Sequence, residues 1–283
     1  MSALQQQSGT GAKAILSAEE IAFYEREGYL VPKYKFSPED VAKMQRLTRK
    51  AVADNPDYVN QPLVCLHVPG NQVQQIKTTK EWLDIAAHPD LLDMSEQLIG
   101  PDLVLWDCGL FYKRQGGGPA TPWHRDGVYW PIKPLASLSV WIAVFDSMIE
   151  NACLRMIPKS HAAKQIGRHS KEFKQDVIFQ HQLLSSEFNE ADAVDLEMKA
   201  GELVFFSPFT IHGANRNLSD RERAGVAMRY MPATSHFDRA AMDPEHARTS
   251  PGAAHHLRPL MLVRGVDRCG KNDFVTGHPK DAA

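Results

Sequence analysis

The feature that most constrains the fold of this 283-residue chain is a series of short β-prone segments after Gly100. Each is rich in β-branched, aromatic or other apolar residues, and glycine or proline punctuates the series, which is typical of strands. The expected strands cover 103–112, 138–145, 154–157, 202–206 and 225–231. Because no regular helical pattern lies between them, we expect an antiparallel sandwich or barrel rather than a parallel α/β sheet.

The first hundred residues show helical spacing instead. Ser17, with Glu20 three positions later, is a capping-box pattern that predicts the start of a helix ending before Gly28. Ser37 followed by Pro38 predicts a second helix start. The expected helices cover 17–27, 37–54 and 89–98, and a short strand is expected at 29–31.

The expected organisation is a single domain over residues 1–283. Its parts are a helical N-terminal buttress (15–100), a β core (101–239) and a C-terminal tail with weak pattern (240–283). Residues 162–193 within the core are polar and lysine-rich. We expect an insertion there with some helix, acting as a mobile lid.

Composition and charge exclude several classes of protein. Hydrophobic residues make up 43% and charged residues 23%, so the chain can bury a core. With 32 basic against 34 acidic residues, nothing indicates a nucleic-acid or membrane-surface partner, and the apolar runs are too short to cross a bilayer. The four cysteines are scattered and the N-terminus lacks a secretory pattern. We therefore expect a cytoplasmic monomer or homodimer that acts on a small molecule.

The residues that carry chemistry begin at His124 and Asp126. In an extended segment, residues two apart point to the same face. An imidazole and a carboxylate on one face are two members of a 2-His-1-carboxylate triad, which binds iron(II) and leaves positions open for substrate and oxygen. An H-x-D pair alone is weak evidence for a metal site. A triad also needs a third ligand, which must come from a neighbouring strand far along the chain.

The third ligand is expected at His212, which follows an apolar strand and a turn. Eleven residues later, Arg223 heads an apolar strand. A permanently charged guanidinium there is costly unless it meets an anion. A dicarboxylate cosubstrate, bound bidentate, would meet that need.

Together these motifs resemble the phytanoyl-CoA dioxygenase family of iron(II)/2-oxoglutarate oxygenases, whose relatives include ectoine hydroxylases. The resemblance rests on the H-x-D at His124, the 150–161 segment ending in Pro-Lys-Ser-His, the pair His212-Gly213, and Arg223 at the family's spacing. It implies a mainly β protein with a helical N-terminal part, whose core is a double-stranded β-helix (a jelly roll, cupin-like). It also implies Fe(II), 2-oxoglutarate and O2.

Residue by residue, the resemblance makes His124, Asp126 and His212 the iron ligands, and Arg223 the partner of the distal carboxylate of 2-oxoglutarate. Trp141 and Lys77 match positions that relatives place near the cosubstrate, although a core tryptophan and a solvated lysine are equally good readings. Where relatives often carry Ser or Thr two residues after the distal histidine, this chain has Ala214. Thr210 is then expected to supply the missing hydrogen bond.

Substrate contacts are expected beside the metal motif. The candidates are an aromatic wall of Tyr112, Tyr129 and Trp130, and Arg229 as a cation. If strand alternation runs unbroken from Arg223, Arg229 points to the same inner face and would suit an acidic substrate such as a carboxylate or phosphonate. A packing role for the rings and an internal salt bridge for Arg229 are the alternatives.

The expected activity is hydroxylation of an unactivated C–H bond, with release of succinate and CO2. Desaturation or demethylation would start from the same chemistry. Two other classes stay open: a cupin-type metal enzyme that does not use 2-oxoglutarate, which would have no use for Arg223, and a non-enzymatic ligand-binding β-sandwich in which the histidines are structural.

Overall fold

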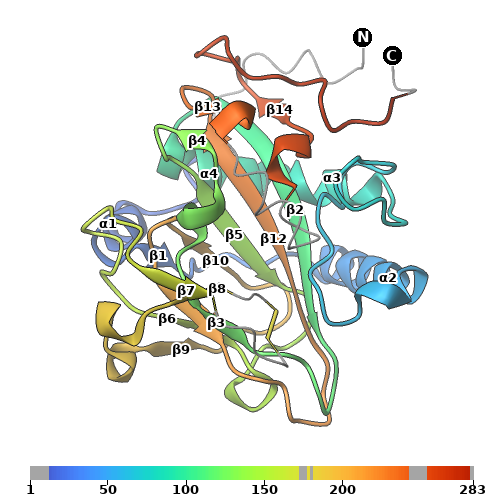
Figure 1. Cartoon of the computed structure of the whole chain (residues 1–283), viewed down its shortest axis with the longest axis vertical. Helices are drawn as coiled ribbons and strands as arrows, with labels where there is room; N and C mark the ends of the chain where they lie inside the picture. Colours follow the sequence, from blue (N-terminus) through green and yellow to red (C-terminus); the bar gives the residue numbers. More distant parts are fainter. Residues whose placement is uncertain (1–12, 172–176, 179–180, 242–253, 281–283) are drawn as a thin grey trace.

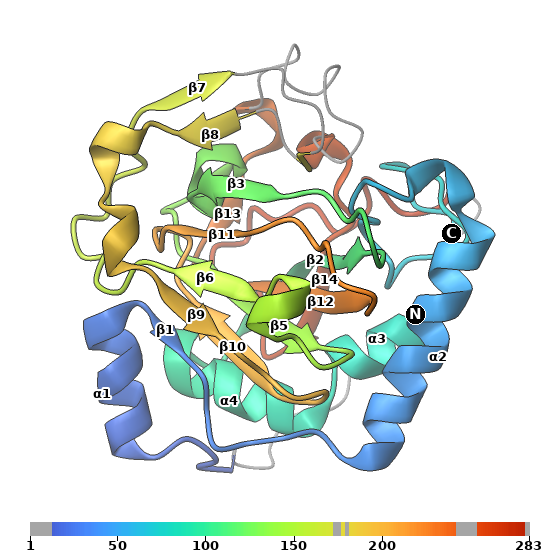
Figure 2. The same cartoon turned by 90° about the horizontal axis from the view of Figure 1, so that it is seen from below.

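Two facing antiparallel sheets form the centre of the computed structural model, which describes residues 13–171, 177–178, 181–241 and 254–280 (Figures 1 and 2). The larger sheet has the order β1-β10-β5-β12-β2-β14 and the smaller the order β3-β11-β6-β9. This jelly-roll arrangement confirms the expected double-stranded β-helix.

The strands of the larger sheet are β1 (Tyr29–Leu30), β10 (Leu203–Phe206), β5 (Leu138–Ala143), β12 (Arg223–Pro232), β2 (Leu103–Lys113) and β14 (Met261–Arg264). Those of the smaller sheet are β3 (Thr121–His124), β11 (His212–Ala214), β6 (Leu154–Met156) and β9 (Val194–Leu196). Two small antiparallel pairs are β4 (Ile132–Lys133) with β13 (His236–Phe237), and β7 (His169–Lys171) with β8 (His181–Leu183). The five strands expected after Gly100 are all present, with ends shifted by up to two residues.

The helices are α1 (Ala18–Glu27), α2 (Pro38–Asp54), α3 (Glu81–Ala86) and α4 (Pro89–Ile99). Ser17 caps α1 through a complete capping box with Glu20, and Gly28 ends it in a left-handed conformation, as the sequence predicts. The helix α3 was not expected, because six residues are too few to show a helical period. Short 3-10 turns are η1 (Pro56–Tyr58), η2 (Asp126–Tyr129), η3 (Ile149–Asn151), η4 (Ser185–Glu187), η5 (Glu190–Asp192), η6 (Arg239–Ala241) and η7 (His255–Leu257).

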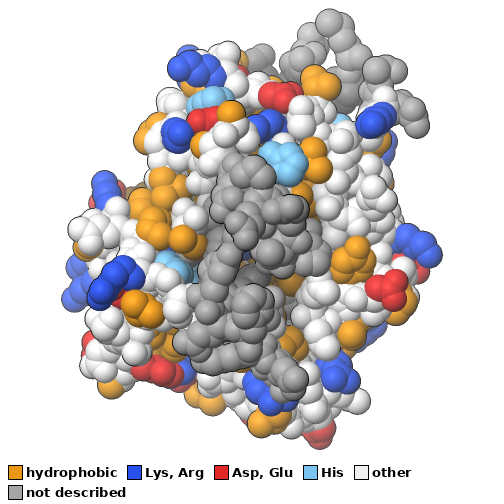
Figure 3. All heavy atoms as spheres, in the orientation of Figure 1, with side chains coloured by type: hydrophobic (Ala, Val, Ile, Leu, Met, Phe, Trp, Pro, Cys, Tyr) orange, Lys and Arg blue, Asp and Glu red, His pale blue; other side chains and the backbone are white. Residues whose placement is uncertain are grey.

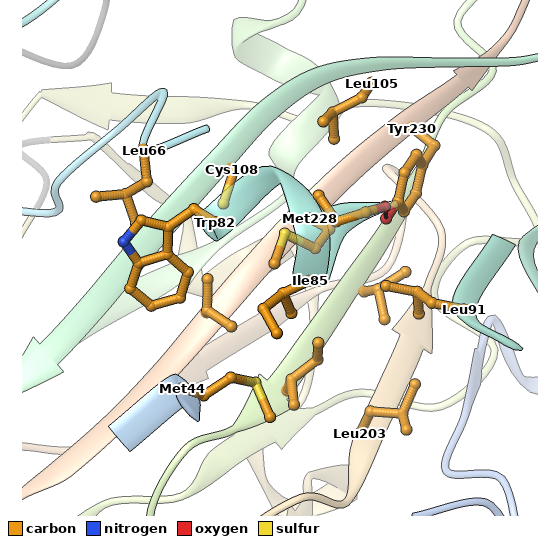
Figure 4. Close-up of a cluster of buried hydrophobic side chains, with 14 of the residues drawn as sticks. Met44, Leu66, Trp82, Ile85, Leu91, Leu105, Cys108, Leu203, Met228 and Tyr230 are labelled. Carbon is orange, nitrogen blue, oxygen red and sulfur yellow. Dashed lines mark hydrogen bonds between the residues drawn. The ribbon is translucent and has the colours of Figure 1, made fainter. Parts of the chain in front are cut away.

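The helices cover the outer face of the larger sheet. In Figure 2, α3 and α4 lie beneath this sheet, with α1 and α2 to either side. Figure 4 shows the buried side chains of this interface, which include Met44 of α2, Trp82 and Ile85 of α3, Leu91 of α4, and Met228 and Tyr230 of β12. Full burial of each large apolar side chain contributes roughly 1.5–3 kcal/mol. The outer face is thus a closed apolar core.

The inner face faces the smaller sheet and carries polar groups. Alternation along β12 directs Ala224, Val226 and Met228 outward and Arg223, Gly225, Ala227 and Arg229 inward. The antiparallel register with β2 places Lys113, Phe111 and Asp107 directly opposite Arg223, Gly225 and Arg229.

A β-bulge interrupts β2 beside the site. The register shifts between Arg229 and Tyr230, which pair with Asp107 and Leu105 respectively, so Trp106 is an extra residue in β2. In strict alternation two adjacent side chains point to opposite faces of the sheet. A bulge reorients them, so that both can reach the same group. Trp106 and Asp107 consequently both contact Arg229.

The segment expected to be a weakly patterned tail after residue 239 contributes to the core. Its strand β14 extends the larger sheet beyond β2, and Arg258 reaches the buried Asp107. The β core therefore does not stop at residue 239. The pairing partner of β14 lies some 160 residues earlier in the chain, so local pattern does not reveal it.

The described parts of the 162–193 insertion differ from expectation. They form the β7–β8 pair and the turns η4 and η5, rather than α-helix; the rest of the insertion, 172–176 and 179–180, lies outside the described residues. Strand β8 lies beside β3, next to the metal motif. That the insertion closes over the site stays a prediction.

The charged side chains on the face shown in Figure 3 are mixed in sign. On the described part of the face in Figure 3, basic side chains are dispersed among acidic and apolar ones and form no continuous basic patch. Within the described ranges, no helix combines the length and the apolar character needed to span a membrane.

Candidate active site

Three side chains from two strands and a turn converge on one point. His124 ends β3, His212 begins β11, and Asp126 begins the turn η2. The Nε2 atom of His124 lies 3.4 Å from Oδ1 of Asp126, and Nε2 of His212 lies 3.9 Å from the same oxygen. Among the described residues this is the one group of histidine, cysteine and acidic side chains close enough to share a metal ion, with ligand atoms within 4.8 Å of one another.

Strand pairing brings the two histidines together. His124 and His212 are direct partners in the antiparallel β3–β11 pair, and their ring centroids are 4.2 Å apart. The expected continuous strand through 124–126 is not present, because β3 ends at His124. Arg125 keeps an extended backbone before the turn, and this still brings Asp126 back beside His124.

The hydrogen bonds of the imidazoles select the form that binds metal. Nδ1 of His124 lies 2.8 Å from the carbonyl oxygen of Pro122, and Nδ1 of His212 lies 3.0 Å from that of Thr210. A carbonyl oxygen only accepts, so each Nδ1 carries the hydrogen and each Nε2 presents a lone pair. Burial lowers the pKa of His212 to about 4, which keeps this ring neutral.

Asp126 has one oxygen held by the protein and one aimed at the histidines. Ser139 donates to Oδ2 at 3.1 Å, and Nη2 of Arg229 lies 3.7 Å from the same atom. Burial alone would raise the pKa of this carboxyl, but the positive charge of Arg229 outweighs it and holds the pKa below its usual range. Two imidazoles and a fixed carboxylate, all buried, are the donor set that suits iron(II) with open positions.

Arg223 is buried on the same inner face, with 1% of its surface exposed. Its Nε and Nη2 donate to the carbonyl oxygen of Ala152 at 2.9 and 2.7 Å. Its guanidinium lies over the ring of Trp141, 5.2 Å from the centroid. Burial lowers the pKa of Arg223 to about 10. Among the described residues no carboxylate pairs with it.

Trp141 reaches Arg223 because the strand beside it carries Gly225. A Cβ atom on Gly225 would lie 1.8 Å from the indole ring, so any side chain there would displace the ring. The fully buried Lys113 is the cross-strand partner of Arg223. Its ammonium donates to the carbonyl oxygens of Ala214 and Asn215. Sequence reasoning missed Lys113.

Arg229 points to the inner face as alternation predicts, but it has internal partners. Its Nη1 lies 2.6 Å from Oδ2 of Asp107, a fully buried carboxylate that also pairs with Arg258. Burial would raise the pKa of Asp107, and Arg258 and Arg229 outweigh it and lower the pKa. The sequence signal for Asp107 was a lone acidic residue within an apolar strand.

The three aromatic residues predicted to contact the substrate do not form a common wall among the described side chains. Trp130 is buried against Trp106, with ring centroids 4.7 Å apart, and Arg229 lies over it. Tyr129 lies in η2, and its side chain is outside the described residues. Tyr112 does not face the site: β2 turns it toward the helices, where its hydroxyl donates to Glu222.

Two cosubstrate assignments from the sequence are not supported by the geometry. Lys77 has an exposed side chain, and its backbone bonds to Asn55 after α2. Thr210 is buried, but its hydroxyl donates to the carbonyl oxygen of Gly28 at 2.7 Å. The contribution of Thr210 to the site is its carbonyl group, which orients His212.

Known proteins share this fold or are similar to this chain in sequence. A non-haem monooxygenase, ThoJ in its apo form, has a TM-score of 0.68 and 21% identity, covering 92% of this chain and 90% of its own. CytC3 with Fe(II) and alpha-ketoglutarate has a TM-score of 0.62 and 22% identity, covering 90% and 91%. The peroxisomal phytanoyl-CoA dioxygenase of Bos taurus is 28% identical over 249 residues, 82% of this chain and 74% of the relative. The ectoine dioxygenase of Bordetella parapertussis is 27% identical over 282 residues, 89% and 88%.

The family match, the related dioxygenases and the buried His-Asp-His triad together define a non-haem iron oxygenase that depends on 2-oxoglutarate. The sequence profile of the phytanoyl-CoA dioxygenase (PhyH) family matches residues 24–225, and the chain belongs to this family. The expected family, enzyme class and cofactors are thereby confirmed.

Proposed function

We propose that this enzyme hydroxylates an unactivated C–H bond of a small acidic molecule, with 2-oxoglutarate converted to succinate and CO2. One observation carries the proposal. A buried triad, in which Nε2 of His124 and of His212 lie 3.4 and 3.9 Å from Oδ1 of Asp126, shares an inner face with a buried arginine that has no carboxylate partner among the described residues. The triad suits iron(II), and the buried Arg223 suits the distal carboxylate of 2-oxoglutarate.

Some side chains of the site would bind the metal and the cosubstrate, and others would fix the orientation of these ligands. His124, Asp126 and His212 would hold the metal, with their orientation fixed by Pro122, Ser139 and Thr210. When bound, iron(II) with 2-oxoglutarate supplies the oxygen-activating redox chemistry. Arg223 would anchor the cosubstrate, with Trp141 keeping the guanidinium in place. What this chain then decides is which C–H bond lies next to the metal.

The charges near the triad support an acidic substrate. Among the described residues, Arg229 pairs with the buried carboxylate of Asp107, which Arg258 also contacts. Asp126 lies 3.7 Å from Arg229, but its charge is engaged once it binds a metal. A carboxylate or phosphonate group on the substrate would then balance Arg229. The rings of Trp106, Phe111 and Trp130 around Arg229 would form the apolar wall of the same pocket.

We also propose that the enzyme works in a reducing compartment such as the cytoplasm. All four cysteines are free thiols, and Cys65, Cys108 and Cys153 are buried. An extracellular protein of this size would gain stability from pairing its cysteines.

The cosubstrate assignment is tested by titrating the apo-protein anaerobically with iron(II) and then 2-oxoglutarate. The readout is the weak visible charge-transfer band of the chelate, and succinate production with oxygen follows. Wild type should show the band, and Arg223→Met should need far more 2-oxoglutarate to reach it. Arg46→Met, which changes an exposed arginine of α2, is the matched control.

If wild type binds iron but shows neither band nor succinate, the cosubstrate assignment is wrong and a cupin-type metal enzyme becomes the better interpretation. If the band forms, acidic small molecules should be screened first. A substrate preference for cationic or neutral compounds would contradict the charge argument.

A further inference from the structure

We propose that Lys113 is the second cation of the cosubstrate subsite, and that it binds the distal carboxylate of 2-oxoglutarate together with Arg223. The inference rests on the proposed function of this site. It adds a residue from a different strand, β2, to the one already assigned on β12.

The strand register brings the two cations together. Lys113 and Arg223 are direct partners in the antiparallel β2–β12 pair, so their side chains project from the same face of the sheet. That face is the inner one, because Phe111 and Gly225, the next residues of the same parity, adjoin the inter-sheet core around Trp141. Lys113 has no exposed surface and Arg223 has 1%.

Two like charges held side by side in a closed site need a counter-ion. The ammonium of Lys113 contacts the carbonyl oxygens of Ala214 and Asn215, and the guanidinium of Arg223 contacts that of Ala152. Within the described part of the chain, neither has an ion pair with a carboxylate. Buried charges are normally paired, because leaving water without a partner is costly. Because no described residue supplies that partner, an anionic ligand is the proposed one.

The spare donors suit a carboxylate. Carbonyl groups use Nε and Nη2 of Arg223 and two contacts of Lys113, which leaves Nη1 and a third ammonium hydrogen for a ligand. A carboxylate presents two oxygens and can accept from both. Burial, together with the neighbouring Arg223, lowers the pKa of Lys113 well below its usual value, and a bound carboxylate would restore the charged form.

A structural role must be separated from a binding role. Lys113 also satisfies two backbone carbonyls after His212, and losing these contacts could disturb the metal site indirectly. Lys113→Gln keeps a side-chain amide that can donate to a carbonyl but removes the charge, whereas Lys113→Met removes both. If the role is electrostatic, glutamine does not restore binding.

The test is calorimetric titration of the iron-loaded protein under nitrogen with two probes. One is 2-oxoglutarate, and the other is 2-oxopentanoate, which has the same chelating end and chain length but no distal carboxylate. We expect Lys113→Gln and Lys113→Met to weaken 2-oxoglutarate binding by about 10- to 100-fold, the usual range for a charge-assisted hydrogen bond. Affinity for 2-oxopentanoate and for iron(II) should change by less than about twofold.

Lys50→Met and Lys77→Met are the controls. Lys50 lies on the exposed side of α2, paired with Asp54, and should leave both affinities unchanged. Lys77→Met decides between the two lysines: a loss of 2-oxoglutarate affinity in this variant and not in the Lys113 variants would overturn the inference.

The inference is also overturned if both Lys113 variants bind 2-oxoglutarate as the wild type does, or if both lose the two probes equally. It falls together with the proposed function if wild type fails to bind 2-oxoglutarate at all. Wild-type binding with unaffected Lys113 variants overturns the lysine assignment alone, so the two failures are distinguishable.

Discussion

The two ends of the inner face of β12 each carry a buried arginine, and they differ in what neutralises it. Arg229 lies 2.6 Å from the carboxylate of Asp107 and 3.7 Å from that of Asp126. Arg223 has a carbonyl oxygen and a tryptophan ring, and the cation opposite it is Lys113. Carboxylates of the protein thus neutralise Arg229, whereas no described carboxylate pairs with Arg223.

This difference separates a structural charge, which already has anionic partners in the metal-free fold, from a charge that gains an anionic partner only when a ligand binds. Both arginines are buried, and both would look alike in a count of buried polar residues. A charge with an internal partner contributes to the folded state and becomes destabilising when that partner is removed. A charge without one contributes to folding only when a ligand is present. The two ends should consequently respond in opposite ways to mutation and to 2-oxoglutarate.

The largest effect is expected from Asp107→Asn. It removes the carboxylate shared by Arg229 and Arg258 and leaves two buried guanidinium groups without it. The free energy of unfolding should fall by about 3–5 kcal/mol, measured by urea denaturation of the metal-free protein. Asp195→Asn breaks an ion pair with Arg155 nearer the surface and should cost less than about 1 kcal/mol. Equal losses in the two variants would contradict the distinction drawn here.

The second effect is the stabilisation that 2-oxoglutarate confers. At a ligand concentration of about 100 times Kd, binding should raise the unfolding free energy of the iron-loaded wild type by about 2.7 kcal/mol. Arg223→Met should gain little at the same concentration, and without ligand it should lose less stability than Asp107→Asn. The measurement is urea unfolding under nitrogen with and without 2-oxoglutarate. A large loss without ligand would place Arg223 among the structural charges.

Acid should weaken the Arg229 end through His67. This histidine is buried near Asp107 and Arg258, and burial lowers its pKa from 6.5 to about 4. Between pH 6.5 and 4 this histidine is protonated in the unfolded chain and neutral in the folded one. The free energy of unfolding therefore falls as the pH drops through this range. Between pH 7 and 5 this histidine should account for about 2 kcal/mol.

His67→Leu should reduce the loss between pH 7 and 5 by that amount, measured by urea unfolding of the metal-free protein at each pH. The comparison concerns the change with pH, so a difference in absolute stability between the two proteins does not affect it. An identical pH dependence in both would show that other groups dominate acid unfolding.

The smallest effect is expected from Ser139→Ala. The hydroxyl donates to Oδ2 of Asp126, and its loss should lower iron(II) affinity by about tenfold, measured by competition with a chelator. Ser95→Ala, which removes a buried hydroxyl of α4 far from the motif in the chain, should leave iron affinity unchanged. A tenfold loss in both variants would indicate a general loosening of the protein.

The sequence predicts the H-x-D pair and the strands because their signals are local, whereas His212 and the β-helix follow from the family resemblance. The H-x-D pair, the capping box at Ser17 and the alternation of β12 each lie within a few residues. Arg223 is detectable for a related reason: a cation heading an apolar strand conflicts with the strand's own pattern.

What the sequence does not predict depends on distant pairing. Asp107 and Arg258 are 151 positions apart, and the bulge at Trp106 breaks the alternation that would place Asp107. Choosing between Lys77 and Lys113 needs the register of β2 against β12, which no local pattern contains. Thr210 was assigned by its hydroxyl, yet its backbone carbonyl is what contacts His212.

The indole of Trp141 occupies the volume that a side chain at position 225 would need. Position 225 therefore cannot vary independently: a bulkier residue there becomes acceptable only after Trp141 is replaced by something smaller. Among descendants of this chain, the two sites should change as a pair, with a small residue at 141 accompanying a larger one at 225. The tightness of one contact beneath the cosubstrate arginine thus sets the order in which mutations can accumulate.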